Sequence, residues 1–166
     1  MTQPVIDAAR FRQVLGHLPT GVCVVSGLHD DEPVGMVIGS FFSVSLNPPL
    51  VGFCAGSSSS TWTKLRQGPG FCASVLAADQ ERISRALASK DPDKFAGIGW
   101  RRSPRGMPIL DGAIAWIDCA LHDVHVAGDH EVVIGQVHDL DLHLDVASER
   151  APLLFFRGGY GLPGPS

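Results

Sequence analysis

Short apolar runs separated by turn residues recur along the whole chain, a pattern that predicts an antiparallel β protein. β-Branched and apolar residues fill positions 21–27, and a polar turn from Asp30 to Pro33 separates this run from a second one at 34–40. Two such runs around a short polar turn are typical of a hairpin. The same pattern predicts further strands at 50–55, 71–76, 113–126, 131–144 and 153–156.

The pattern predicts only three short helices. Asp7 can cap a first helix that runs to about Leu15, and an amphipathic stretch at 61–67 predicts a second. A third helix is expected from a cap at Asp79 to about Ser89.

Two segments are expected to be irregular. Residues 41–48 form a Ser-rich bend bounded by Pro48 and Pro49, and residues 90–112 are interrupted repeatedly by Gly and Pro. Long loops of the second kind are often lids or binding loops in compact domains. Because strands outnumber helices and follow one another through turns, the fold is expected to be mainly β, an antiparallel Greek-key barrel with short flanking helices.

The composition favours one domain, residues 1–166, that associates with a second copy. A chain of 166 residues buries roughly 70% of its unfolded surface. With 45% hydrophobic and only 18% charged residues, a homodimer with an apolar interface is expected. The net charge of −4 argues against a nucleic-acid partner.

The location is predicted to be cytoplasmic. No run of 18 apolar residues is present, so no membrane span is expected, and residues 1–13 lack the apolar core of a secretory signal. The cysteines are scattered through apolar runs without CxxC spacing, so they are expected to be buried free thiols. They are Cys23, Cys54, Cys72 and Cys119.

A run of five hydroxyl residues, Ser57 to Thr61, precedes the second helix. Free backbone N–H groups at a helix start, together with hydroxyls, suit a phosphate, and Lys64 and Arg66 are near enough in sequence to add charge. The alternative is an ordinary loop whose last serine only caps the helix. From this feature alone both interpretations stay open.

The sequence Gly128-Asp129-His130 is open to two interpretations as well. Gly-Asp suits a hairpin turn, and a histidine beside it is then ordinary surface. Alternatively His130 lies on the rim of a pocket, where an imidazole can hydrogen-bond a ligand or donate a proton near neutral pH.

Other chemistries find little support in the sequence. His122 and His125 lie three apart on a predicted strand and so face opposite sides, which argues against a metal site with His130. There is no GxSxG nucleophile motif and no GxGxxG after a strand, so a serine hydrolase and a Rossmann domain are not expected.

Stretches spread over nearly the whole chain resemble, in order and spacing, the flavin reductase-like family, which has the FMN-binding split-barrel fold. The closest likeness is to the reductase components of two-component aromatic or steroid-ring monooxygenases. The stretches are FRQVLGHLPTGVCVVSG, VGMVIGSFFSVSLNPPLVGFC, DPDKFAGIGW, GMPILDGAIAWIDC, AGDHEVVIGQV and APLLFFRGGYG.

The resemblance implies an NAD(P)H:flavin oxidoreductase. NADH or NADPH would pass a hydride to FMN or FAD, and the reduced flavin would leave for a separate flavin-dependent monooxygenase. Family members are homodimers with flavin sites near the subunit interface.

The resemblance also implies a set of site residues. His130 would be catalytic and, with Asp129 and Tyr160, would contact the nicotinamide. The flavin phosphate would lie near Ser57, Ser59 and Thr61. The remaining flavin contacts would come from Val37, Ile38, Gly39, Ser40, Leu46, Asn47, Pro48, Ala55, Lys94 and Phe95.

The chain departs from the family pattern at a few positions. Many members carry Thr and Ser where this chain has Val37 and Gly39, and an Asn where it has Ser74. Backbone N–H groups can still serve, and glycine permits a close approach. The missing side-chain donors motivate an alternative function: a flavin- or haem-binding carrier or sensor without reductase activity. A structural dimer without a ligand is a third alternative.

Overall fold

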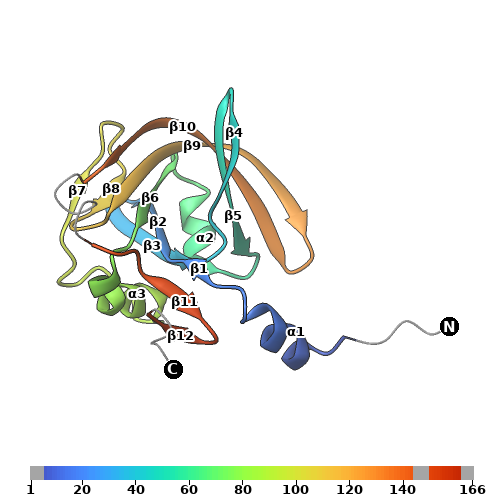
Figure 1. Ribbon diagram of the computed structural model, residues 1–166. Coiled ribbons are helices and arrows are strands. Elements are labelled where there is room, and N and C mark those ends of the chain that lie inside the picture. Colours follow the sequence, from blue (N-terminus) through green and yellow to red (C-terminus); the bar gives the residue numbers. More distant parts are fainter. Residues whose placement is uncertain (1–5, 144–149, 162–166) are drawn as a thin grey trace.

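The computed structural model describes residues 6–143 and 150–161 (Figure 1). Its main feature is a seven-stranded antiparallel sheet in the order β3-β2-β6-β9-β10-β5-β4, which confirms the mainly β, Greek-key split barrel. The seven strands are β2 (Cys23–His29), β3 (Glu32–Ile38), β4 (Phe42–Leu46), β5 (Pro49–Gly56), β6 (Phe71–Val75), β9 (Ala115–Ala127) and β10 (His130–Leu142).

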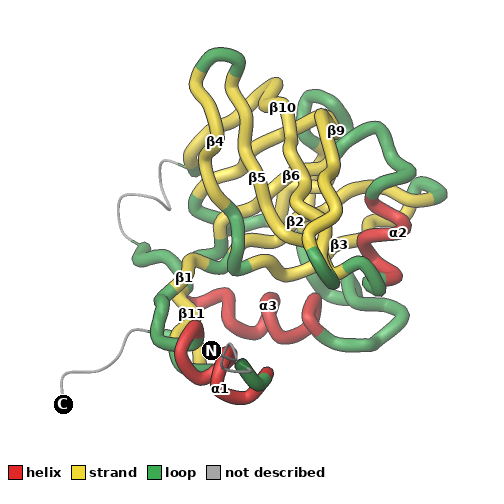
Figure 2. The backbone as a smooth tube through the Cα atoms, turned by 90° about the vertical axis from the view of Figure 1, so that its right-hand side faces the viewer, coloured by secondary structure: helices red, strands yellow, loops and turns green. Residues whose placement is uncertain are grey.

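Smaller elements surround this sheet. β1 (Thr20–Gly21), β11 (Leu154–Phe156) and β12 (Gly159–Tyr160) form a three-stranded sheet, and β7 (Trp100–Arg102) pairs with β8 (Pro108–Leu110). The helices are α1 (Ala8–Leu15), α2 (Ser60–Leu65) and α3 (Glu81–Ala88), with a 3-10 turn, η1 (Ala78–Gln80), before α3. Figure 2 shows α1 and α3 on one side of the sheet and the β4–β5 hairpin projecting from the other.

Two hydrophobic cores explain the strand pattern. Inside the barrel, Phe53 packs edge-on against Trp62 and Phe71, with ring centroids 5.9 and 5.3 Å apart. A second core lies on the other face, where Val24 packs with residues that include Leu87 of α3. Because β2 is buried on both faces, its sequence is a continuous apolar run rather than an alternating one.

The structure corrects several boundaries. The predicted bend at 41–48 contains β4, whose bulge interrupts the pairing with β5 between Ser43 and Ser45. The predicted loop at 90–112 contains the β7–β8 hairpin, and the glycine-rich stretch after β11 contains β12. Short strands of this kind were missed because Gly and Pro around them conceal the alternation.

Two further predictions change. Asp30 and Asp31, with φ of 53° and 61°, form a two-residue turn, so β3 already begins at Glu32. Asp79 lies inside η1 and pairs with Arg150 instead of capping α3.

The strand predicted at 131–144 is β10, and residue 144 lies outside the described residues. Asp7 does cap α1, because its side chain accepts a hydrogen bond from the Arg10 N–H.

Candidate functional site

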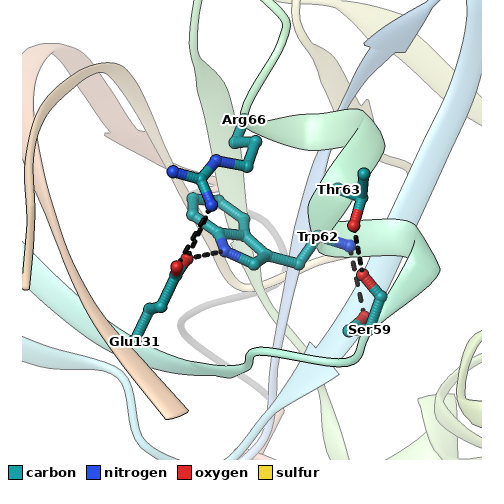
Figure 3. Close-up of polar contacts among 5 residues, drawn as sticks. All are labelled: Ser59, Trp62, Thr63, Arg66 and Glu131. Carbon is teal, nitrogen blue, oxygen red and sulfur yellow. Dashed lines mark hydrogen bonds and ion pairs between the residues drawn. The ribbon is translucent and has the colours of Figure 1, made fainter. Parts of the chain in front are cut away.

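The hydroxyl run forms a turn between β5 and α2, which we call the cradle turn (residues 57–61). Ser59 is the N-cap of α2, since its Oγ accepts the Trp62 N–H at 3.2 Å (Figure 3). The Ser59 carbonyl also accepts from the Thr63 hydroxyl at 3.1 Å. The capping interpretation is therefore confirmed for Ser59, but capping uses only an acceptor site, and the hydroxyl proton remains available to a ligand.

The turn between β9 and β10 lies directly beside the cradle turn. The Ser57 N–H donates to the Asp129 carbonyl at 3.0 Å, and His130 pairs with Gly56 across the two strands. A Cβ atom added at Gly56 would lie 4.0 Å from Nε2 of His130. The fold thus brings His130 and Asp129 next to the start of the cradle turn.

The His130 ring is held by its neighbour. Nδ1 of His130 lies 2.7 Å from an Asp129 carboxylate oxygen, and the His130 side chain is 51% exposed. The hydrogen bond from His130, and then its charge, lower the pKa of the exposed Asp129 carboxyl. With Nδ1 engaged, Nε2 is the ring atom available to a ligand.

A polar cluster that we did not predict fixes α2 to the same strand. The Glu131 carboxylate accepts from the indole N–H of Trp62 and, at 3.1 Å, from Arg66 (Figure 3). The Glu131 side chain is only 13% exposed and Trp62 only 2%. Trp62 and Arg66 are four apart on a helix and so share a face, a spacing that sequence reasoning can detect.

The end of β3 lies close to this region. The Ser40 hydroxyl accepts the Cys54 N–H on β5 at 2.9 Å. Ile38 and Ala55 point into the inner core, so only their backbone can meet a ligand. Val37 packs against the second core. A Cβ atom at Gly39 would lie 2.9 Å from the Thr20 hydroxyl, which shows how closely these segments approach.

A cleft of about 970 Å³ opens beside the cradle turn. It lies between α2, the β2–β3 hairpin and the loop that follows α3. Three residues predicted to contact flavin, Thr61, Lys94 and Phe95, line it together. Phe95 also lies over β3, since a Cβ atom at Gly35 would be 3.1 Å from its ring.

Other predicted site residues are not brought to this region by the chain itself. Leu46, Asn47 and Pro48 form the tip of the β4–β5 hairpin, at the opposite end of β5 from the cradle turn (Figure 1). β5 has eight residues, which span about 26 Å. Tyr160 lies on β12 beside α3, and its hydroxyl is 2.9 Å from the Ser84 hydroxyl that donates to it.

Three of the cysteines are buried free thiols, as expected, but Cys54 is half-buried. Burial raises the pKa of Cys23 to about 11 and, with help from the Asp118 charge, that of Cys119 to about 12. The pKa of Cys72 is also raised, mainly by burial. These thiols are therefore unreactive at neutral pH.

In the described ranges, no three His, Cys, Asp or Glu side chains gather as a metal site would require, and His125 instead lies 3.2 Å from Asp123. None of the described helices combines the length and hydropathy that crossing a membrane requires.

Comparison with known proteins identifies the family. The sequence model of the family described as flavin reductase like domain matches residues 15–162 of this chain. The chain therefore belongs to this family. It is 51% identical to a flavin reductase of Pseudomonas putida over 94% of this chain and 90% of that one. It is 47% identical to the flavin-dependent monooxygenase reductase subunit HsaB of Rhodococcus jostii, over 93% of this chain and 77% of the relative.

Solved structures agree with this assignment. Nitrilotriacetate monooxygenase component B from Mycobacterium thermoresistibile superposes with a TM-score of 0.87 at 46% identity, covering 92% of this chain and 84% of that one. The NADH:FAD oxidoreductase SgcE6 of Streptomyces globisporus, in complex with NAD and FAD fragments, gives a TM-score of 0.86 at 35% identity, covering 98% of both chains.

Proposed function

We propose that this protein is an NAD(P)H:flavin oxidoreductase that reduces FMN or FAD and supplies the reduced flavin to a separate flavin-dependent monooxygenase. Membership of the family supports the reaction. The relatives support the pairing with an oxygenase, since HsaB is described as the reductase subunit of a monooxygenase. A Streptomyces globisporus relative, 40% identical, is described as an NADH-dependent FAD reductase.

The observation that carries the proposal is the junction between the cradle turn and the β9–β10 turn. The backbone hydrogen bond from Ser57 to Asp129 joins the candidate phosphate-binding turn to the residue that precedes His130. The neighbouring bond from Trp62 to Glu131 holds α2 on the same strand as His130. Two groups that would act on opposite parts of one ligand are thus fixed relative to each other before the ligand arrives.

The residues present fit a flavin. Ser57, Ser59 and Thr61 would hold its phosphate, and the segment Val37–Ser40 would lie along its ring. Side-chain donors are missing at Val37 and Gly39, so the flavin contacts of this segment would come from its backbone N–H groups. The cleft that begins at Thr61 is lined by cationic and aromatic side chains, among them Lys64 and Phe95.

A bound flavin would supply the redox chemistry, as the acceptor of the nicotinamide hydride. The protein's own part is to bind and orient. His130, with Nδ1 bonded to Asp129, presents Nε2 to the nicotinamide carboxamide or donates a proton from that atom. Holding two flat rings in contact removes most of the entropic barrier to transfer.

The hairpin tip supports a homodimer. Leu46, Asn47 and Pro48 and the cradle turn stand at opposite ends of β5, so both can contact one flavin only if the tip comes from a second copy. Leu46 is 91% exposed, and Phe42 and Val44 of the same hairpin are more than 40% exposed. An apolar, protruding hairpin is suited to dimerisation.

A steady-state assay tests the proposal. NADH and NADPH oxidation would be measured with no flavin and with FMN, FAD or riboflavin added. We expect oxidation that depends on added flavin and on the intact protein. Oxidation at background rates with all three flavins would contradict the proposal.

One observation favours a second function. Val37 has no hydroxyl and packs into the second core, so a donor common in the family is missing. A flavin- or haem-binding carrier or sensor would not need it. Cofactor retained through purification without NADH or NADPH turnover would favour this alternative.

A further inference from the structure

The cleft extends well beyond the groups expected to hold FMN. Its lining includes Pro33 and Gly35 of β3, Lys64 of α2, and Phe95 and Trp100 from the chain that follows α3. None of the four residues Val37–Ser40 lines it. A volume of about 970 Å³ is at the upper end of the range for small-molecule sites.

The direction of β3 shows where the cleft lies relative to the expected ring. β3 runs from the turn at Asp30 and Asp31 to Ile38, a length of about 23 Å for its seven residues. The ring segment is at the Ile38 end, whereas Asp30 and Glu32, at the other end, line the cleft. Thr61 of the cradle turn lines the cleft too, so the cleft begins at the phosphate and continues away from the ring.

We propose that this cleft binds the AMP moiety of FAD and that the protein therefore binds FAD more tightly than FMN. The inference rests on the proposed function, because it assumes a flavin phosphate at the cradle turn. FMN ends at that phosphate, whereas FAD continues with a second phosphate, a ribose and an adenine.

The lining suits these groups. Lys64 follows Thr61 by one helical turn and supplies a cation for the second phosphate. Lys94 is partly committed, since its ammonium donates to the Leu87 carbonyl at 3.2 Å at the end of α3. Phe95 and Trp100 provide aromatic surface for adenine, and base–aromatic stacking is a general source of affinity.

The acidic residues of the cleft are consistent with a nucleoside at the far end. Asp30 and Glu32 accept hydrogen bonds from ribose hydroxyls or the adenine amino group, and they repel any additional phosphate. Asp91 and Asp93 lie in the loop that lines the same cleft, so that with Asp30 and Glu32 the four carboxylates outnumber the three lysines Lys64, Lys90 and Lys94. A nucleotide that ends in an uncharged nucleoside therefore fits better than one that ends in a phosphate.

NADH also contains an AMP moiety, so the same chemistry has two possible sources. Equilibrium binding without nicotinamide distinguishes them. Dissociation constants for FAD and FMN would be measured by flavin fluorescence, with and without AMP. We expect FAD to bind at least about tenfold more tightly than FMN, because one charge-assisted contact is worth roughly that factor. AMP should weaken FAD binding and leave FMN binding unchanged, because it reproduces only the part of FAD that lies beyond the flavin phosphate.

A variant makes the test specific. Ala96 is exposed and lines the cleft, and Ala96→Trp would fill it beyond the cradle turn. We expect this change to raise the FAD dissociation constant about tenfold, to the level of FMN, with FMN itself unaffected. Ala88→Trp, on an exposed position of α3 outside the cleft, is the matched control.

The outcomes separate the two proposals. Equal affinity of the wild type for FAD and FMN, or no competition between AMP and FAD, would overturn the FAD proposal while leaving the reductase function intact. If Ala96→Trp instead raises the KM for NADH equally with both flavins, the cleft serves the nicotinamide dinucleotide and the proposal is wrong. Failure to bind either flavin would overturn the proposed function itself.

Discussion

The cradle turn and the tip of the β4–β5 hairpin stand at the two ends of one strand, yet they differ in how they are held. At one end the Ser57 N–H is bonded to Asp129, Ser59 caps α2, and Glu131 holds Trp62. At the other end Leu46 is 91% exposed, and a bulge interrupts the pairing of β4 with β5. The cradle turn is preorganised by bonds within the chain, whereas the hairpin tip is exposed to solvent.

This difference indicates how binding and assembly are divided. Groups that must keep a fixed geometry toward a ligand are secured by hydrogen bonds from two elements. The exposed apolar side chains of the hairpin tip are buried only when a second surface covers them. We therefore expect changes at the preorganised end to affect catalysis and flavin binding within each subunit, and changes at the tip to affect association first.

The largest effect is expected for His130→Ala. Loss of the imidazole should lower kcat roughly a hundredfold, the usual contribution of a positioned acid or base. The ring is half exposed, so circular dichroism and the melting temperature should hardly change. An unchanged kcat would remove His130 from the site.

Glu131→Ala should come next. It leaves the indole N–H of the buried Trp62 and the Arg66 guanidinium without their acceptor, which we expect to cost about 2 kcal/mol of unfolding free energy. As α2 loosens, the KM for flavin should rise about tenfold, with a smaller effect on kcat. Chemical denaturation and steady-state kinetics measure the two effects.

Glu131→Gln is the matched control for that variant. Its amide oxygen still accepts from Trp62, so most of the stability and flavin affinity should return, although the ion pair with Arg66 is lost. If both variants bind flavin like the wild type, Glu131 does not position the cradle turn.

At the hairpin tip, Leu46→Asp should shift the protein from dimer to monomer in light scattering. Because Leu46 makes few contacts within its own chain, the structure of the subunit should persist, and flavin affinity should fall several-fold through the lost dimer. Leu46→Met keeps an apolar side chain and should stay dimeric. A monomeric wild type, or a dimeric Leu46→Asp variant with full affinity, would show that the tip is not an interface.

The smallest effect is expected for Asp129→Asn. The pKa of Asp129 is lowered by His130, so its carboxylate stabilises the fold at pH values above the ordinary carboxyl pKa of 3.8. That contribution is lost as the pH falls through the lowered pKa. The melting temperatures of wild type and variant should therefore differ slightly at neutral pH and converge in acid. A difference that grows in acid would contradict this assignment.

The sequence predicted the parts that depend on local patterns. Alternation and turn residues located most of the barrel strands, because each buries one or two faces against a core. β4 was missed because Pro48 and Pro49 obscured a strand that pairs on one side. Asp79 was taken for a cap, but its actual partner, Arg150, lies far away in sequence, where local reasoning gives no signal.

The candidate site was predictable only in part for the same reason. A run of hydroxyls before a helix is a local signal, and so is a histidine after a Gly-Asp turn. The acceptor role of Glu131 depends on the pairing of β10 with β5, which brings it over α2. The cleft joins three segments distant in sequence, so its size and lining follow only from the folded chain.

Anaerobic mixing of the protein, FAD and NADH tests the central claim most directly. The account predicts that oxidised flavin disappears and NAD⁺ appears in equal amounts, at a rate that falls sharply in His130→Ala. Flavin that stays oxidised in the presence of NADH, although it is bound by a folded wild-type protein, would contradict it.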